Sequence, residues 1–278
     1  MDIKNIPNEE DLKFIILDDE VEPIYDAIDK SVYNAERFKC SFKLFDDAMN
    51  GGFKSGDLAI ISGISGEGKT TLAQTLTYNF CKQGLPCLWF SYEVSLEHLH
   101  KKFEDMGISD FYYAYSPKKN TTGKIEWVKA KIREGYVKYG TKIIFIDHID
   151  FLIPTNLKTT DNQSIMLKNI ATELKTLAIE LNVIIICMAH LKKLPNDKEP
   201  DMQDIGHSAG IFQLADYVLM IHREKNKGYK SFGGDTNGET YTNNSIIKYV
   251  KNRETGQLKF IKCQYNNGKF VEVTENYE

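Results

Sequence analysis

The sequence predicts an α/β domain in which helices cover both faces of a mainly parallel sheet. From Phe42 onward, short apolar runs alternate with stretches of helical periodicity, and strands that alternate with helices form parallel sheets buried on both faces. Three strand patterns follow one another near the end of the chain, which predicts a C-terminal antiparallel hairpin extension. With 278 residues, the chain is long enough for one large domain and an arm, or for two small domains.

The elements of the parallel part follow from hydrophobic periodicity. The expected strands are 58–62, 87–92, 142–146, 182–188 and 217–222, and the expected helices are 70–82, 96–106, 124–138 and 164–181. The last helix has the clearest pattern, because apolar residues from Ile165 to Leu181 repeat at helical spacing. Asp161 or Asn162 can cap its start.

The C-terminal extension is expected to contain strands 245–250, 258–265 and 269–273. An Asn-Gly pair, Asn267-Gly268, joins the last two and is a strong hairpin signal. Residues 226–244 are rich in Gly, Asn, Lys and Thr, so we expect a mobile insertion there.

Residues 1–40 are expected to form an acidic arm, and residues 41–278 the folded domain. Residues 1–36 contain 11 acidic and 3 basic side chains, a net charge of −8, whereas the remaining 28 acidic and 32 basic side chains give +4. A mildly basic body is compatible with nucleic-acid binding but equally with an ordinary solvated surface. Within the arm, residues 23–36 can form a helix with Pro23 near its first turn.

No feature of the sequence indicates a membrane or an oxidising compartment. The longest apolar run, residues 183–189, is too short to span a bilayer, and the N-terminus has no signal pattern. Five cysteines form no C-x-x-C pair, so we expect core thiols. We therefore expect a cytoplasmic protein, in the host cytoplasm if it is viral, with no membrane partner.

A glycine-rich segment at residues 63–70 fits the pattern G-x-x-x-x-G-K-[ST] at every fixed position. A strand pattern precedes it and a helix pattern follows, as in a phosphate-binding loop. Its glycines let backbone N–H groups point inward, and the helix N-terminus adds partial positive charge. Lys69 can reach the β- and γ-phosphates, and the Thr70 hydroxyl can bind Mg²⁺. The motif therefore predicts a nucleoside triphosphate as ligand, and its expected contacts are Gly63, Ser65, Gly66, Glu67, Gly68, Lys69, Thr70 and Thr71.

Two carboxylates at strand ends are candidates for the chemistry. Asp147 ends an apolar strand and can hold Mg²⁺ at the carboxyl edge of a sheet; the alternative is an ordinary turn residue. Glu93 follows the strand at 87–92 and can act as general base toward water. It can equally be a surface residue that opens the next helix.

Three further polar residues are weaker candidates from their position alone. His190 closes the strand at 182–188 and can sense the γ-phosphate, or it can be a turn residue. Lys251 and Arg253 are separated by one residue in an extended segment, so their side chains point the same way, which suits an arginine finger reaching a neighbour's nucleotide. A solvated turn explains the two cations as well.

The glycine-rich loop, Glu93, Asp147, His190 and the Lys251–Arg253 pair follow one another along the chain. In this order, these motifs resemble the motor domain of DnaB-type hexameric replicative helicases, within the RecA-like P-loop ATPases. The resemblance runs from about Ser41 to Val273 and begins with the segment 42–58 that leads into the phosphate loop. Segment 89–95 is similar to the one with the family's catalytic glutamate, which implies Glu93. Segment 144–152 is similar to the metal-binding aspartate segment, which implies Asp147.

The same resemblance assigns the sensor and the finger. His190 corresponds to the sensor position, where phage primase-helicases and their mitochondrial relatives also carry His. Segment 246–256 is similar to the family's Lys-x-Arg finger, which implies that Lys251 and Arg253 act across a subunit interface. A ring, expected to be a hexamer with ATP and Mg²⁺ at its interfaces, follows from the family.

The resemblance also implies single-stranded DNA as partner, held by loops at 156–163 and 192–210. Lys192 and Lys193 are the expected phosphate contacts, and the backbone N–H groups of Gly206, Ser208 and Gly210 can hold phosphates. This segment has no Arg, unlike that of many family members. Forty residues are also too few for the collar or primase domain that these helicases carry.

The predicted function is therefore an ATP-dependent, ring-shaped helicase or translocase acting 5′→3′ on single-stranded DNA in replication, with a primase or other replisome protein as further partner. One alternative is a RadA- or KaiC-like ATPase of recombination or regulation that does not unwind. Another is an assembly or loader subunit in which ATP holds an oligomer together with little turnover.

Overall fold

The computed structural model describes residues 35–110, 112–115, 124–154, 160–191, 209–225 and 241–273. The chain divides into two units, Met1–Ala35 and Glu36–Glu278. Residues 23–34 of the expected arm helix lie outside the described residues, as do 156–159 and 192–208 of the two expected DNA loops. The second unit contains all the elements discussed below.

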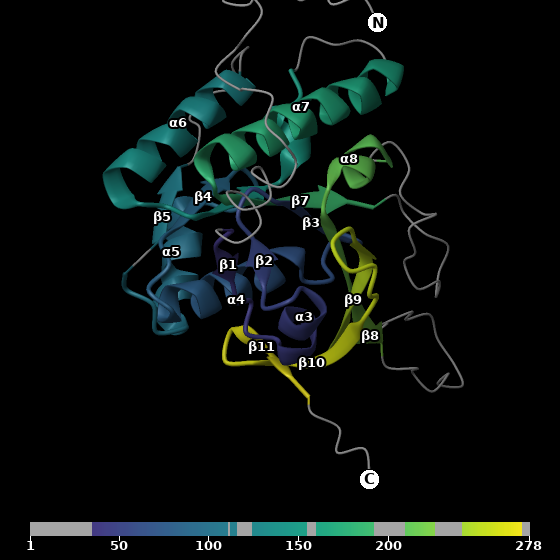
Figure 1. Cartoon of the computed structure of the whole chain (residues 1–278). Helices are drawn as coiled ribbons and strands as arrows, with labels where there is room; N and C mark the ends of the chain where they lie inside the picture. Colours follow the sequence, from purple (N-terminus) through teal and green to yellow (C-terminus); the bar gives the residue numbers. More distant parts are fainter. Residues whose placement is uncertain are drawn as a thin grey trace, which may run out of the picture. The chain divides into compact units, whose positions relative to one another are not determined.

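A nine-stranded sheet forms the centre of the described part of this unit, with the order β11-β10-β9-β8-β3-β7-β6-β4-β5. Strands β3 to β8 pair in parallel, and β8 to β11 pair antiparallel, as Figure 1 shows in the yellow C-terminal strands. The strands are β3 Leu58–Gly63, β4 Cys87–Ser91, β5 Tyr112–Tyr115, β6 Ile143–Asp147, β7 Ile184–His190, β8 Tyr217–Lys225, β9 Tyr241–Asn252, β10 Phe260–Asn266 and β11 Lys269–Glu272. The predicted fold class, a parallel sheet with an antiparallel extension, is confirmed.

Helices cover both faces of the sheet, which is why the central strands are continuously apolar. In Figure 1, α6 and α7 lie on one side of the sheet, and α4 and α5 on the other. The longer helices are α4 Lys69–Lys82, α5 Leu96–Asp105, α6 Lys124–Tyr139 and α7 Thr160–Leu181. Ser95 caps α5 by accepting a hydrogen bond from the His98 N–H at 3.2 Å.

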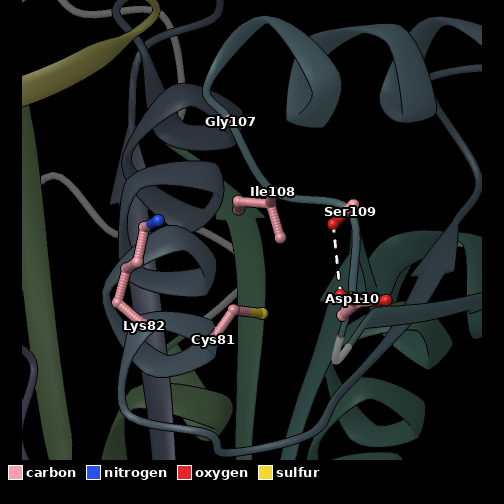
Figure 2. Close-up of a pocket in the computed structure, with 6 residues that line it drawn as sticks. All are labelled: Cys81, Lys82, Gly107, Ile108, Ser109 and Asp110. Atoms are coloured by element: carbon pink, nitrogen blue, oxygen red, sulfur yellow. Dashed lines mark hydrogen bonds between the residues drawn. The ribbon is translucent and has the colours of Figure 1, made fainter.

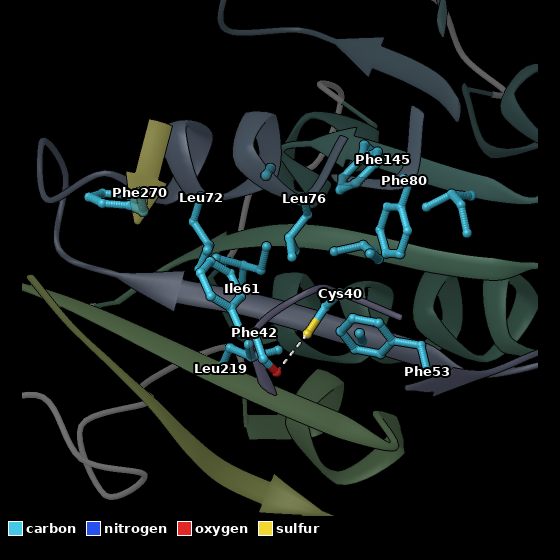
Figure 3. Packing of buried hydrophobic residues seen from close by; sticks show 14 of the residues in the cluster. Cys40, Phe42, Phe53, Ile61, Leu72, Leu76, Phe80, Phe145, Leu219 and Phe270 are labelled. Carbon is cyan, nitrogen blue, oxygen red and sulfur yellow. Dashed lines mark hydrogen bonds between the residues drawn. The ribbon is translucent and has the colours of Figure 1, made fainter. Parts of the chain in front are cut away.

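Two hydrophobic cores fill the space between the sheet and these helices. On the α4 side, Leu72, Leu76 and Phe80 point toward the strands, and Phe145 of β6 lies among them (Figure 3). On the other side, residues of α6 and α7 pack on β3, β6 and β7. All five cysteines are free and buried, as expected for core thiols.

The antiparallel hairpin β10–β11 reaches back to the start of α4. The N–H of Phe270 donates a hydrogen bond to Thr75 Oγ1 at 3.0 Å, and the Phe270 ring lies next to Gly68. Figure 3 shows the Phe270 side chain beside Leu72 of the helix. The last strand of the domain therefore supports the helix that follows the glycine-rich loop.

Several short elements are absent from the sequence-based prediction. They are β1 Arg37–Phe38, β2 Phe53–Lys54, α3 Lys43–Ala48, the 3-10 helix η2 Ile149–Leu152, β5 and α8 Ala209–Leu214. The expected cap of α7 is wrong, because this helix begins at Thr160 and so includes Asp161 and Asn162. Residues 241–244, expected in a mobile insertion, belong to β9, which extends by pairing with β8; residues 226–240 lie outside the described part.

Among the described helices, none combines the length and apolar character that crossing a bilayer requires.

Candidate active site

The glycine-rich loop joins β3 to α4 in the arrangement that its pattern predicts. Gly63 is the last residue of β3, and Ser65 and Gly66 are exposed at the tip of the loop. Gly66 and Gly68 have φ angles of 85° and 106°, in the left-handed region that favours glycine. Gly68 is the N-cap of α4, so Lys69, Thr70 and Thr71 form its first turn. The loop therefore presents a helix N-terminus to an anion.

Lys69 and Thr70 point toward the carboxyl edge of the sheet. The Lys69 ammonium donates to the carbonyl of Gly63 at 3.0 Å and to that of Ile64 at 3.1 Å, so it folds back onto the first residues of the loop. The Thr70 hydroxyl donates to Asp147 Oδ2 at 2.9 Å. This contact joins two residues that are 77 positions apart and brings together the two oxygen ligands predicted for Mg²⁺.

The strand order explains this convergence. Strands β3, β7, β6 and β4 are neighbours and run parallel, so their carboxyl ends meet at one edge. Gly63 pairs with His190 at the end of β7, and Ser91 pairs with Asp147. Glu93 follows β4 by two residues, and its carboxylate lies within 4.8 Å of a ring nitrogen of His190. The structure thus brings Lys69, Thr70, Glu93, Asp147 and His190 to one place.

The electrostatics of the site reflect burial and mixed charge. Burial lowers the pKa of Lys69, and the nearby carboxylates of Glu93 and Asp147 oppose this effect. Burial raises the pKa of Asp147, against the hydrogen bond from Thr70, and Glu93 adds to the rise. Burial, followed by the charges of Lys69 and His148, lowers the pKa of His190. A neutral imidazole at His190 can accept or donate one hydrogen bond toward a phosphate.

Glu67 differs from the other residues predicted to contact the nucleotide. Its side chain is buried and turned toward β8, where a carboxylate oxygen lies 3.3 Å from His222 Nδ1. Its backbone N–H donates to the Ile64 carbonyl at 3.3 Å. The side chain thus holds the loop against β8 rather than facing the phosphate side.

Lys251 and Arg253 lie at the opposite edge of the sheet from this site. Asn252 of β9 pairs with Tyr217 at the start of β8. Tyr217 in turn pairs with Ala59, near the start of β3. The start and end of β3 are five residue steps apart, or roughly 16 Å. A single chain therefore keeps its own Arg253 away from its own glycine-rich loop.

Both cations contact the short helix α8, and Arg253 also contacts Asp216, two residues after the end of that helix. Lys251 donates to the carbonyls of Phe212 and Gln213 at 2.9 Å each. Arg253 donates to the Gln213 carbonyl at 2.6 Å and to Asp216 Oδ1 at 3.3 Å. The half-exposed Arg253 side chain is thus held at the C-terminal end of α8.

Asp216 belongs to a buried acidic pair that the sequence did not reveal. Lys175 of α7 donates to Asp216 Oδ2 at 2.5 Å and lies 3.5 Å from Asp57 Oδ1. Burial, with Asp216 nearby, raises the pKa of Asp57 to about 6. Asp216 also accepts the Leu58 N–H at 2.9 Å, which fixes it beside the first residue of β3.

Of the residues predicted to contact DNA, the structure describes Gly210 alone. It is the second residue of α8, and a Cβ atom there would lie 3.1 Å from the Cβ of Lys168. Close approach of α8 to α7 explains this glycine without any ligand. Lys192, Lys193, Gly206 and Ser208 lie outside the described residues, so their role stays a prediction.

A small groove of about 160 Å³ lies at the far end of α4 (Figure 2). It is lined by Cys81, Lys82, Gly107, Ile108, Ser109 and Asp110. The 14 residues of α4 place it about 20 Å from Lys69, and its volume is below that of ordinary ligand pockets. This groove is not part of the site.

The sequence matches the family described as the DnaB-like helicase C-terminal domain, over residues 38–107 and 115–272. The chain belongs to this family. The match includes every predicted catalytic residue at the carboxyl edge of the sheet, and also Lys251 and Arg253. The family was expected from the sequence, and that expectation is confirmed.

Known proteins of this kind are similar along most of the chain. The replicative DNA helicase DnaC of Bacillus subtilis is 28% identical over 269 residues, which cover 84% of this chain and 56% of the relative. The replicative DNA helicase DnaB of Treponema pallidum is 26% identical over 213 residues, or 65% of this chain and 47% of the relative. The chain spans about half the length of these curated relatives.

One solved structure, a DnaB-like replicative helicase studied for its interactions with primase, supports the DnaB-like fold. It superposes with a TM-score of 0.72 at 19% identity and covers 95% of this chain and 70% of its own. At this identity, the superposition shows the fold alone.

Proposed function

We propose that this chain is the ATP-hydrolysing motor of a ring-shaped DNA helicase that moves along single-stranded DNA in replication. The observation that carries the proposal is the 2.9 Å contact between Thr70 and Asp147 beneath the glycine-rich loop. It supports a site for a nucleoside triphosphate with its metal ion. The relatives are replicative DNA helicases, and they supply the reaction class.

The residues present fit Mg²⁺, which prefers oxygen ligands and binds through one or two side chains together with phosphate oxygens. Thr70 and Asp147 would hold it, and it would neutralise charge on the phosphates. The backbone N–H groups of the loop would hold the phosphates of ATP. Lys69, now bonded to the loop carbonyls, would turn to the β- and γ-phosphates.

Glu93 would orient water and accept its proton during hydrolysis, because it is an exposed carboxylate close to Lys69 and Asp147. His190 would contact the γ-phosphate from the end of β7. Since the expected DNA loop at 192–210 follows β7 in the chain, a change at His190 would be passed to that loop.

Lys251 and Arg253 would complete the site of a neighbouring subunit. Their position at the opposite edge of the sheet argues against action on the chain's own nucleotide. A finger supplied by a neighbour implies a head-to-tail assembly with one site per interface, and the family resemblance favours a closed ring, a hexamer. To engage, Arg253 would leave Asp216 and Gln213.

The finer parts of the proposal rest on the family. Single-stranded DNA would pass the loops at 156–163 and 192–210, in the 5′→3′ direction. A primase is proposed as partner because a structural neighbour is described by its interactions with one.

A subunit-mixing experiment tests the central claim. We would measure ATP hydrolysis with and without single-stranded DNA for the wild type, Lys69→Ala, Arg253→Ala and equal mixtures of the two variants. Each variant alone is expected to lose activity, by about 10³-fold or more for the finger. A mixture restores part of the activity, because some interfaces then combine an intact loop with an intact Arg253. Arg133→Ala, at an exposed ion pair with Glu180, is the control.

The rival functions give different results. DNA-independent hydrolysis that does not respond to Arg253→Ala would contradict the translocase and favour the regulatory ATPase. Failure to unwind a forked duplex despite DNA-stimulated hydrolysis would favour a translocase without helicase activity. An assembly subunit with little turnover would be unaffected by Glu93→Gln.

A further inference from the structure

Three side chains with metal-binding atoms meet beside the nucleotide site. Glu93, His148 and His190 each offer one ligand atom, and these atoms all lie within 4.8 Å of one another. The two imidazole rings are 4.2 Å apart between centroids and stand nearly perpendicular, at 79°. His148, which follows the magnesium ligand Asp147 in sequence, has no role in the hydrolysis proposed above.

This donor set differs from the one that holds Mg²⁺. Magnesium is bound through oxygen atoms in octahedral geometry, and the oxygens of Thr70 and Asp147 are such ligands. Two imidazoles and one carboxylate are instead the set found in zinc sites with three protein ligands and one open position. Imidazole nitrogen favours zinc and its neighbours among the first-row metals.

The surroundings of His148 match those of a metal-bound histidine. The residue is 8% exposed, and its Nδ1 atom is buried without an aligned hydrogen bond. Asp150 Oδ2 lies 3.2 Å from this nitrogen. A carboxylate beside the second ring nitrogen commonly orients a histidine whose other nitrogen binds metal. Coordination through Nε2 would place a proton on Nδ1 and align it with Asp150.

We propose that Glu93, His148 and His190 bind a zinc-class divalent transition-metal ion, and that this ion stops ATP hydrolysis by occupying the carboxylate of Glu93. The second half rests on the proposed function, whereas the binding itself does not. With a metal–ligand distance of about 2.0–2.1 Å, tetrahedral ligands lie about 3.3 Å apart. Glu93 is exposed and can close this gap by changing rotamer, while His190 is held at the end of β7 and His148 directly after the end of β6.

Binding would remove the base without disturbing the magnesium ligands. A carboxylate coordinated to a dication is a poor proton acceptor, so ATP can stay bound to the loop while turnover stops. The fourth position of the ion is open to water or to a phosphate oxygen. The expected effect on kinetics is therefore a fall in kcat that added Mg²⁺ does not reverse.

Cobalt is a suitable probe because its visible absorption reports on coordination. We would titrate Co²⁺ into the chelator-treated, nucleotide-free full chain and then displace it with Zn²⁺. One Co²⁺ per chain is expected, with tighter binding of Zn²⁺. Glu93→Gln, which alters an exposed side chain, and His148→Asn should each abolish the absorption. Asp150→Asn should weaken binding by about 10–100-fold, and His98→Asn, at an exposed histidine of α5, should change nothing.

The outcomes separate the two halves of the proposal. Absence of Co²⁺ binding below millimolar concentration, or binding that survives both Glu93→Gln and His148→Asn, would overturn the site. A bound metal without loss of hydrolysis in the wild type would overturn the inhibition. If the wild type hydrolyses no ATP at all, the proposed function fails, and the cobalt titration still decides whether the metal site exists.

Discussion

Replacing Asp57 by asparagine should stabilise the folded chain at neutral pH and have little effect below pH 4. Asp57 is 9% exposed and shares one ammonium group, that of Lys175, with Asp216. Burial and the nearby carboxylate raise its pKa from 3.8 to about 6. Asparagine has nearly the same shape and carries no charge, so it removes the unfavourable buried charge.

The pH dependence of the free energy of unfolding follows from the difference between the pKa of Asp57 in the folded and unfolded chain. A carboxyl group whose folded pKa is raised binds its proton more tightly in the folded state, so its contribution to stability is full below pH 4 and is lost as the pH rises through 6. A rise from 3.8 to about 6 corresponds to about 3 kcal/mol at neutral pH, since one pKa unit is about 1.36 kcal/mol. The stability of the variant relative to the wild type should therefore increase by about 2 kcal/mol between pH 4.5 and pH 7.

Urea unfolding at several pH values measures this difference. Asp47→Asn, at an exposed aspartate of α3, is the control and should give a difference near zero. A difference for Asp57→Asn that is flat between pH 4.5 and pH 7 would refute the reasoning. So would a variant that is less stable than the wild type at pH 7.

Three further changes test other parts of the structure. Asp147→Asn should lower magnesium-dependent ATP hydrolysis by about 10²–10³-fold. Nucleotide binding in the presence of EDTA should stay intact. Unchanged hydrolysis would show that Asp147 does not hold the magnesium ion. Gly68→Ala should destabilise the chain by about 1–2 kcal/mol or more, because its φ is 106° and the Phe270 ring lies 3.0 Å from the new Cβ. Gly84→Ala, with φ 73° and open space, should cost less in the same urea experiment, and equal costs would show that the Phe270 contact is unimportant. Thr77→Val removes the acceptor of the Trp89 indole N–H, a 2.9 Å bond in the core, and should cost about 1–3 kcal/mol in thermal unfolding; a cost near zero would show that this bond adds little.

The elements around the glycine-rich loop could be predicted because their signals are local. Strand β3, the loop and α4 are contiguous, and each has a dense pattern of its own. The missed elements are short or depend on distant partners. Helices α3 and α8 have six residues each, fewer than two helical turns, so periodicity cannot reveal them. The first residues of β9 are polar and become strand by pairing with β8.

The site was predictable as a set of strand ends but not as a set of contacts. Asp147, Glu93 and His190 each follow an apolar run, and parallel strands bring such positions to one edge. Which of these side chains contact one another depends on the order of the strands in the sheet. His148 lies against His190 because β6 and β7 are neighbours, and nothing near either residue in the sequence indicates this. The pairing of Lys175 with Asp57 and Asp216 likewise needs α7 to cross the start of β3.

The support that β11 gives to α4 has a consequence for how the domain is made. The loop at residues 63–70 is synthesised about two hundred residues before Phe270, which packs on Gly68 and bonds to Thr75. Contacts of such long range form late and slow the folding of a domain. During synthesis at about 5–20 residues per second, some ten seconds or more would pass between the synthesis of the glycine-rich loop and that of Phe270. The ability to hold a nucleotide tightly should therefore mark the completion of the whole domain, rather than the folding of the segment that carries the motif.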